Sequence, residues 1–167
     1  MSGRSNVGKS SLINALGENR LLARISSSPG KTRLIVYFCV ENKLLLTDLP
    51  GFGHAGVSRQ MRETYSKLVD GYLNSGRPIA LVLHLLDIRH APTPEDLQML
   101  GWLSQKKIPC LILLAKADKL SRSQTLQRRA EIVRDLPGEG PYDLMVFSSF
   151  NRQSVIDLRQ KIADRIE

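Results

Sequence analysis

The sequence predicts an α/β domain of three layers, in which helices cover both faces of a mostly parallel sheet. The first observation is that short apolar runs alternate along the chain with stretches of helical periodicity. The second is the pattern G-x-x-x-x-G-K-[ST] at residues 3–10, directly before a helical stretch. The third is a composition of 42% hydrophobic residues over 167 positions, which suits one core. We therefore expect a single domain over residues 1–167.

The glycine-rich segment at residues 3–10 predicts a phosphate-binding loop. Its two glycines, Gly3 and Gly8, allow a tight turn and a close approach to a ligand. The loop's N–H groups can then point at an anion, and the helix that follows adds the positive end of its dipole. We expect Lys9 to reach the β- and γ-phosphates and the Ser10 hydroxyl to hold Mg²⁺. The predicted nucleotide-contacting residues of this loop are Gly3, Arg4, Ser5, Asn6, Val7, Gly8, Lys9, Ser10 and Ser11.

Such a loop normally follows a strand, but only Met1 and Ser2 precede Gly3. The first strand is therefore expected to be missing or truncated, and we expect the native gene product to begin upstream. A chance match of the pattern within a Gly/Ser-rich turn stays open until a strand and a helix are found on its two sides.

The remaining elements follow from hydrophobic periodicity. Apolar runs predict strands at 34–40, 44–48, 79–86, 110–115 and 143–147, the first two joined as a hairpin. Helical spacing predicts helices at 58–74, 94–106, 121–137 and 154–166. Ser121 and Gln124 form a capping box at the start of the third of these helices. We expect its inner face to consist of Leu126, Ala130, Val133 and Leu136.

The charge and the cysteines limit the class of protein. The chain carries 24 Lys and Arg against 16 Asp and Glu, a net charge of +8 that attracts polyanions such as nucleic acid. The longest apolar run, 79–86, is too short to cross a bilayer, and no signal peptide is evident, so we expect a cytoplasmic protein. Cys39 and Cys110 lie in apolar runs and are expected to be buried thiols.

A second motif, Asp48-Leu49-Pro50-Gly51, stands at the end of a predicted strand. A carboxylate at that place can hold Mg²⁺ through water, and the N–H of a glycine three residues later can reach a γ-phosphate. Alone, the pattern D-x-x-G is usually a turn. After a phosphate loop and a hairpin it predicts a nucleotide contact at all four residues.

A third motif, Lys116-Ala117-Asp118, follows the predicted strand 110–115. An aspartate there can accept both the N1–H and the N2–H₂ of guanine, a donor pair that adenine lacks. Alone, the motif is better explained as a solvated surface pair. Ser148 and Ser149, after the last strand, are expected to place backbone N–H groups near the guanine O6.

In this order, the motifs closely resemble those of the EngB family (also called YihA or YsxC) of bacterial ribosome-assembly GTPases. This family lies within the translation-factor-related, TrmE-Era-EngA-like P-loop GTPases. The resemblance extends over nearly the whole chain and is carried by residues 3–11, 28–32, 48–53, 87–90 and 116–119. It implies one G domain that hydrolyses GTP to GDP and phosphate with Mg²⁺, and a nucleotide state that gates binding to the precursor of the large ribosomal subunit. It also implies a link to cell division and septation, and we expect a monomer.

The resemblance also assigns the switch segments. Thr32 would be the threonine of the first switch, which closes on Mg²⁺ and the γ-phosphate, with Pro29, Gly30 and Lys31 beside the nucleotide. Residues from Phe52 onward would form the second switch, whose ordering depends on the bound nucleotide.

Besides the missing first strand, two positions, Phe52 and Ala115, depart from the usual GTPase pattern, and Asn6 suggests a device that could compensate for Phe52. Phe52 stands where Ras-like proteins carry a water-orienting glutamine, so intrinsic hydrolysis is expected to be slow. Asn6 is a candidate K⁺ ligand, because related GTPases with asparagine here use K⁺ as added positive charge; the alternative is that it only stabilises the loop. Lys9, Asn6 and Thr32 are thus the candidates for transition-state stabilisation. Ala115 replaces the Asn or Thr that tethers the base loop to the phosphate loop, which is expected to weaken guanine binding.

Two other functions stay open. A P-loop ATPase or kinase shares the phosphate loop but does not need the Lys116 and Asp118 pair. A nucleotide-dependent RNA- or ribosome-binding module with negligible turnover would fit Phe52 and Ala115. Each group of basic residues taken singly is better explained as a solvated face, but together with the net charge of +8 they suit docking on ribosomal RNA through phosphate contacts. These residues are Arg20, Arg24, Lys31, Arg33, Arg122, Arg128, Arg129, Arg134, Arg152, Arg159, Lys161 and Arg165.

Overall fold

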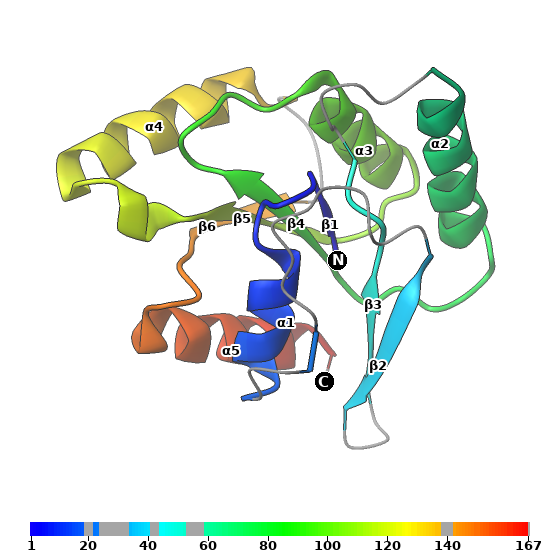
Figure 1. The fold of residues 1–167 in the computed structure, drawn as a ribbon, viewed down its shortest axis with the longest axis horizontal. Coiled ribbons are helices and arrows are strands. Elements are labelled where there is room, and N and C mark those ends of the chain that lie inside the picture. The colour runs from blue at the N-terminus through cyan, green and yellow to red at the C-terminus, as the bar shows by residue number, and fades with distance from the viewer. Residues whose placement is uncertain (19–21, 24–33, 41–43, 53–58, 138–141, 167) are drawn as a thin grey trace.

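The computed structural model describes residues 1–18, 22–23, 34–40, 44–52, 59–137 and 142–166. It has three layers, as predicted: a sheet lies between helices α1 and α5 on one face and α2, α3 and α4 on the other (Figure 1). Within these residues, every helix is too short or too polar to span a bilayer.

Four parallel strands form the main sheet in the order β1-β4-β5-β6. They are β1 (Ser2–Gly3), β4 (Val82–Asp87), β5 (Cys110–Ala115) and β6 (Tyr142–Val146). The register pairs Leu85 with Leu113 across β4 and β5. Strands β2 (Val36–Val40) and β3 (Leu44–Asp48) form the predicted antiparallel hairpin. Because the four main strands are parallel, their carboxyl ends meet at one edge, where ligands bind in such sheets.

Strand β1 is present and has two residues. It pairs with β4 through Ser2 opposite His84 and Gly3 opposite Leu85. On its other side, the Leu49 N–H donates to the Met1 carbonyl at 3.0 Å, at the end of the hairpin. The glycine-rich loop therefore begins from a strand that is hydrogen-bonded on both sides.

The helices begin and end close to the predicted residues. Their bounds are Lys9–Leu16 for α1, Arg59–Leu73 for α2, Pro94–Gln105 for α3, Arg122–Asp135 for α4 and Arg152–Ile166 for α5, with a short 3₁₀ turn, η1, at Ala117–Lys119. The capping box of Ser121 and Gln124 is confirmed. Helix α3 begins with a second box, formed by Thr93 and Asp96.

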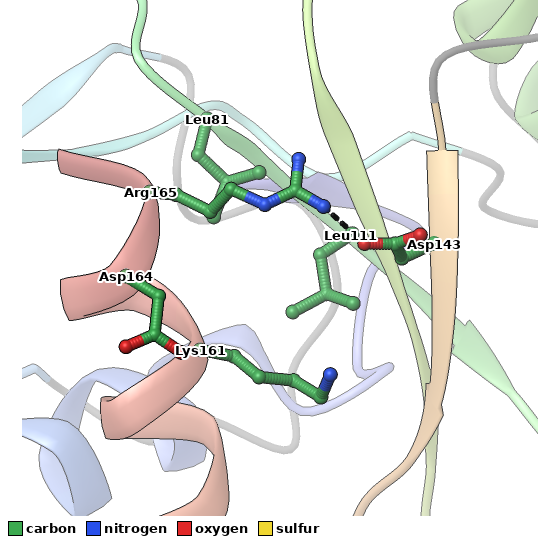
Figure 2. A pocket seen from close by; sticks show the side chains of 6 residues that line it. All are labelled: Leu81, Leu111, Asp143, Lys161, Asp164 and Arg165. Atoms are coloured by element: carbon green, nitrogen blue, oxygen red, sulfur yellow. Dashed lines mark hydrogen bonds and ion pairs between the residues drawn. The ribbon is translucent and has the colours of Figure 1, made fainter.

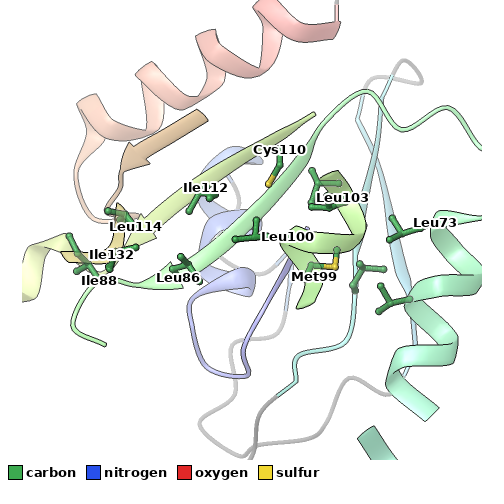
Figure 3. Close-up of a cluster of buried hydrophobic side chains, with 13 residues drawn as sticks. Leu73, Leu86, Ile88, Met99, Leu100, Leu103, Cys110, Ile112, Leu114 and Ile132 are labelled. Carbon is green, nitrogen blue, oxygen red and sulfur yellow. The ribbon is translucent and has the colours of Figure 1, made fainter. Parts of the chain in front are cut away.

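Two clusters of buried apolar side chains hold the layers together. Alternate residues of β4, such as Leu86, face helices α2, α3 and α4, where they pack with Leu100, Ile112 and Ile132 (Figure 3). The other face of the sheet packs against α1 and α5 through the second cluster, which includes Leu12, Ile13, Leu83, Leu85, Leu111, Leu113 and Leu158. Burial on both faces explains why β4 and β5 are continuous apolar runs.

Two predictions about burial are wrong. Leu126 and Val133 of α4 are 62% and 48% exposed, whereas Ile132 is fully buried. The helix carries two apolar stripes, and the one through Ile132 and Leu136 packs on the core. Cys39 in β2 is exposed, contrary to expectation, while Cys110 in β5 is buried as expected.

Candidate nucleotide-binding site

The glycine-rich loop connects β1 directly to α1. Gly3 has φ +140°, and a Cβ there would lie 2.6 Å from the Leu85 carbonyl oxygen of β4. Gly8 has φ +120° and begins the helix, its carbonyl accepting from the Leu12 N–H at 2.9 Å. A strand before and a helix after the loop are the context that a phosphate loop requires, so a chance match in an isolated turn is excluded.

Lys9 lies buried against this loop. Its Nζ donates to the carbonyl oxygens of Gly3 and Arg4 at 3.1 and 3.2 Å. Burial lowers the pKa of Lys9, and the nearby Asp48 carboxylate partly opposes this shift. An ammonium held by neutral carbonyls in a buried place is poorly compensated, so a bound phosphate would stabilise its charge.

Asp48 ends β3 beside the same loop. It is 6% exposed, and its Oδ1 is buried without a hydrogen-bond partner in the described part of the chain. Burial raises the pKa of this carboxyl, and Lys9 opposes that rise. The described residues contain no cluster of three or more His, Cys, Asp or Glu that could hold a metal ion. One carboxylate, a hydroxyl from Ser10 and phosphate oxygens are the donor set that suits Mg²⁺.

The segment after Asp48 lies along the glycine-rich loop. The Ser5 N–H donates to the Phe52 carbonyl at 2.9 Å, and Arg4 forms a parallel bridge with Phe52. Gly51 lies so close to Ser5 that a Cβ on it would be 2.8 Å from the Ser5 Cα. The motif at residues 48–51, which was predicted to contact a γ-phosphate, therefore lies against the predicted phosphate-binding loop at residues 3–10.

The Phe52 side chain points into the core rather than toward the loop. It is 6% exposed, stacks on His84 with ring centroids 6.4 Å apart, and contacts the Tyr65 ring of α2 at 5.4 Å. The ring therefore cannot orient a water molecule at the phosphates, and packing alone explains its burial.

His84, in the middle of β4, is a site residue that sequence reasoning missed. Its Nδ1 lies 2.8 Å from the Ser2 hydroxyl, and its Nε2 lies 3.1 Å from the Asp96 carboxylate. Burial opposes ionisation of Asp96, but hydrogen bonds from His84 and Thr93 outweigh it and lower its pKa. The histidine thus connects β1, the start of α3 and the ring of Phe52. In the sequence, the feature that could have indicated this role is the presence of a histidine within an otherwise apolar strand.

The predicted base-binding segments lie next to the glycine-rich loop. Lys116 has left-handed backbone geometry, with φ 63°, and its Nζ donates to the Asn6 carbonyl at 2.7 Å. The Oδ1 of Asp118 accepts from the Ser148 hydroxyl at 2.7 Å. Burial opposes ionisation of Asp118, but hydrogen bonds from Ser148 and Lys119 outweigh it and lower its pKa. Two loops more than a hundred residues apart in sequence are thus joined by one lysine.

Most of the predicted site residues are therefore brought to one edge of the sheet. Ala117 and Ser149 adjoin Asp118 and Ser148, and Leu49 and Pro50 lie buried between Asp48 and Gly51. The first-switch residues Pro29, Gly30, Lys31 and Thr32 lie outside the described residues. Asp87, which ends β4, was not predicted, yet its Oδ2 lies 3.0 Å from the Lys116 Nζ. The position of an acidic residue at the carboxyl end of a strand could have indicated it.

A hollow of about 240 Å³ lies away from these residues, near the amino ends of the strands (Figure 2). It is lined by Leu81, Leu111, Asp143, Lys161, Asp164 and Arg165, and an ion pair between Arg165 and Asp143 crosses its rim. Its mixed charges and its place at the opposite edge separate it from the nucleotide-binding edge.

Comparison with known proteins identifies the family. A family model described as "50S ribosome-binding GTPase" matches residues 1–116. The probable GTP-binding protein EngB of Halothermothrix orenii is 44% identical over 143 residues, covering 83% of this chain and 72% of the relative. The protein of the same name from Syntrophomonas wolfei is 43% identical over 166 residues, covering 98% and 84%. The crystal structure of a probable GTP-binding protein EngB matches with a TM-score of 0.76 at 25% identity, covering 99% of this chain and 96% of that one. The chain therefore belongs to the EngB family of GTP-binding P-loop GTPases.

Proposed function

We propose that the edge formed by the glycine-rich loop, Asp48 and the base loop binds GTP with Mg²⁺. The observation that carries this proposal is the 2.7 Å hydrogen bond from Lys116 to the Asn6 carbonyl, because it brings the base loop beside the phosphate loop. Asp118 would then accept the two guanine donors, which an adenine nucleotide cannot offer, and this disfavours an ATPase.

The buried cation and carboxylate give the phosphate end its chemistry. Lys9 would turn from the carbonyls of Gly3 and Arg4 to the β- and γ-phosphates. The residues that would hold Mg²⁺ are Ser10 and Thr32, with Asp48 acting through water. When bound, this ion neutralises charge on the phosphates.

Hydrolysis is proposed to be slow. The main support is that Phe52, at the position of the water-orienting residue, is packed between Tyr65 and His84. The Phe52 ring cannot hold the attacking water, so we propose that rate acceleration comes from positioning and charge. Asn6 as a K⁺ ligand and Asn6 as a loop stabiliser both stay predictions. Equal turnover in KCl and NaCl would exclude the first.

We further propose that the nucleotide state gates binding to the precursor of the large ribosomal subunit in the cytoplasm. The family description and the net charge of +8 support an RNA partner. Arg122, Arg129 and Arg134 are exposed on α4 and available for phosphate contacts. Arg159 is less available, because it donates to the Ala15 and Leu16 carbonyls at the end of α1.

The experiment is a titration of GTP and ATP followed by phosphate release with and without large ribosomal subunits. Tight GTP binding, poor competition by ATP and slow release that subunits alter would support the proposal. Equal competition by ATP would favour a P-loop ATPase instead. If the protein binds subunits in a GTP-dependent manner but releases no measurable phosphate, with or without subunits, the result would favour a binding module without turnover.

A further inference from the structure

The carboxylate of Asp87 binds two cations at the end of β4. The Arg89 Nε donates to its Oδ1 at 2.8 Å and an Arg89 terminal nitrogen donates to its Oδ2 at 2.7 Å, which is a bidentate arrangement. The Lys116 Nζ lies 3.0 Å from the same Oδ2. Arg89 and Lys116 are thus connected through one carboxylate, which accepts charge-assisted hydrogen bonds from both cations.

Lys116 is the residue that this cluster constrains. Its ammonium is shared between Asp87 Oδ2 and the Asn6 carbonyl, so the side chain is held stretched from one loop to the other. Its left-handed backbone is unfavourable for a residue with a side chain, and contacts are needed to maintain it. Ala115 offers no polar side chain for the same purpose. The base loop is therefore joined to the phosphate loop through Lys116, and Asp87 fixes where that lysine points.

The cluster differs from an ordinary surface ion pair. The Asp87 side chain is only 10% exposed, whereas that of Arg89 is 39% exposed. Burial opposes ionisation of Asp87, but hydrogen bonds from Arg89 and Lys116 outweigh it and lower the pKa of the carboxyl. The Ile88 carbonyl between Asp87 and Arg89 also accepts from the Arg128 Nε of α4 at 3.2 Å, which anchors this turn. The Asp87 carboxylate, held in this way, can keep the Lys116 ammonium in one position.

We infer that Asp87 and Arg89 are positioning residues for guanine recognition, which they support by holding Lys116 between the base loop and the phosphate loop. The inference rests on the proposed function, since it takes Asp118 as the residue that reads guanine. Asp87 sets the direction of the lysine, and Arg89 sets the rotamer of Asp87. We call Asp87, Arg89 and Lys116 together the clamp. The clamp replaces the tether that an Asn or Thr at position 115 would provide, so the affinity for the guanine base depends on the clamp.

The test measures dissociation constants of GDP and of pyrophosphate for the full chain carrying D87N or R89Q. Pyrophosphate has no base and can contact the phosphate loop alone. A variant that weakens GDP binding but not pyrophosphate binding therefore has a defect in the base loop and not in the whole site. The matched control is D143N, which removes a different carboxylate–arginine pair, with Arg165, at the opposite edge of the sheet. Urea unfolding of each variant reports stability independently.

We expect D87N to weaken GDP binding about tenfold or more, R89Q to weaken it by less, and D143N to leave it unchanged. Pyrophosphate affinity should change by less than about twofold in all three, a range that ordinary surface changes produce. Equal losses for GDP and pyrophosphate would overturn the inference, as would GDP binding by D87N that matches D143N.

A separate variant, D118N, distinguishes failure of the clamp from failure of the base site. Xanthine carries an oxygen where guanine carries its amino group. The amide introduced by D118N should therefore make the protein prefer xanthosine diphosphate (XDP) to GDP. If D118N shows this exchange while D87N binds GDP normally, only the clamp is refuted. If D118N binds GDP as wild type does, the proposed base site itself is wrong, and the inference about Lys116 falls with it.

Discussion

Replacement of Gly51 by alanine should destabilise the nucleotide-free protein. An added Cβ would lie 2.8 Å from the Ser5 Cα, 2.9 Å from the Ser5 nitrogen and 2.9 Å from the Lys9 Nζ. Ordinary contacts begin at 3.4 Å, so the two backbones must separate by about 0.6 Å. Two of the three atoms are backbone and cannot rotate away, which makes this a case of overpacking that costs about 1–3 kcal/mol. For a chain of this size, 2 kcal/mol lowers Tm by about 4–8 °C.

The assay is thermal unfolding without nucleotide, with G71A as the matched control. Gly71 lies in α2 with open space around its Cα, so alanine there should raise stability by about 0.5–1 kcal/mol through helix propensity. A G51A variant that melts at or above the wild-type temperature would refute the contact between this segment and the glycine-rich loop. The same variant should lose more affinity for GTP than for GDP, because the Gly51 N–H is proposed to meet the γ-phosphate. Equal losses would refute that role.

Three further changes test other parts of the site. F52Q should lower the free energy of unfolding by about 2–4 kcal/mol and leave phosphate release no faster, because the side chain at this position packs inward on Tyr65 and His84; faster release would contradict this orientation. D48N should raise Tm without nucleotide, since burial already disfavours the charged carboxylate, and should increase the Mg²⁺ concentration needed for turnover; a lower Tm with an unchanged Mg²⁺ requirement would count against it. The Asp87 carboxyl has a folded pKa below its unfolded value near 3.9, so its stabilising effect is present above about pH 4 and is lost as pH falls through the folded pKa. The difference in urea-unfolding free energy between wild type and D87N should therefore shrink from pH 6 to pH 3, and a constant difference would refute the assignment.

Sequence patterns predicted those parts of the structure that depend on neighbours in the chain. The capping box of Ser121 and Gln124 and the apolar runs of β4 and β5 involve residues a few positions apart, so their local chemistry is sufficient. The glycines of the phosphate loop were predicted for the same reason, because Gly3 and Gly8 adopt positive φ angles that other residues avoid.

Features that depend on distant segments were not predictable in this way. Helix α4 carries two apolar stripes, and only contact with the core decides that Ile132 is buried and Leu126 is exposed. His84 looks like an isolated polar residue in an apolar strand until β1 and α3 bring Ser2 and Asp96 to its two ring nitrogens. The two-residue strand β1 shows the same limit, since Ser2 and Gly3 form a strand through pairing with β4.

Strand β4 holds both halves of the proposed site. In its middle, His84 contacts Ser2 at the entrance to the glycine-rich loop and stacks on Phe52 of the second-switch segment. At its end, Asp87 holds Lys116 of the base loop. The strand is fixed by parallel pairing with β5 along its whole length and is buried on both faces, so these contacts share one rigid support. The base loop and the second-switch segment both form hydrogen bonds with the glycine-rich loop: Lys116 donates to the Asn6 carbonyl, and the Ser5 N–H donates to the Phe52 carbonyl. A nucleotide would contact the glycine-rich loop between these two hydrogen bonds. If the loop rearranges around the phosphates, both hydrogen bonds would therefore change together, while β4 keeps His84 and Asp87 in place.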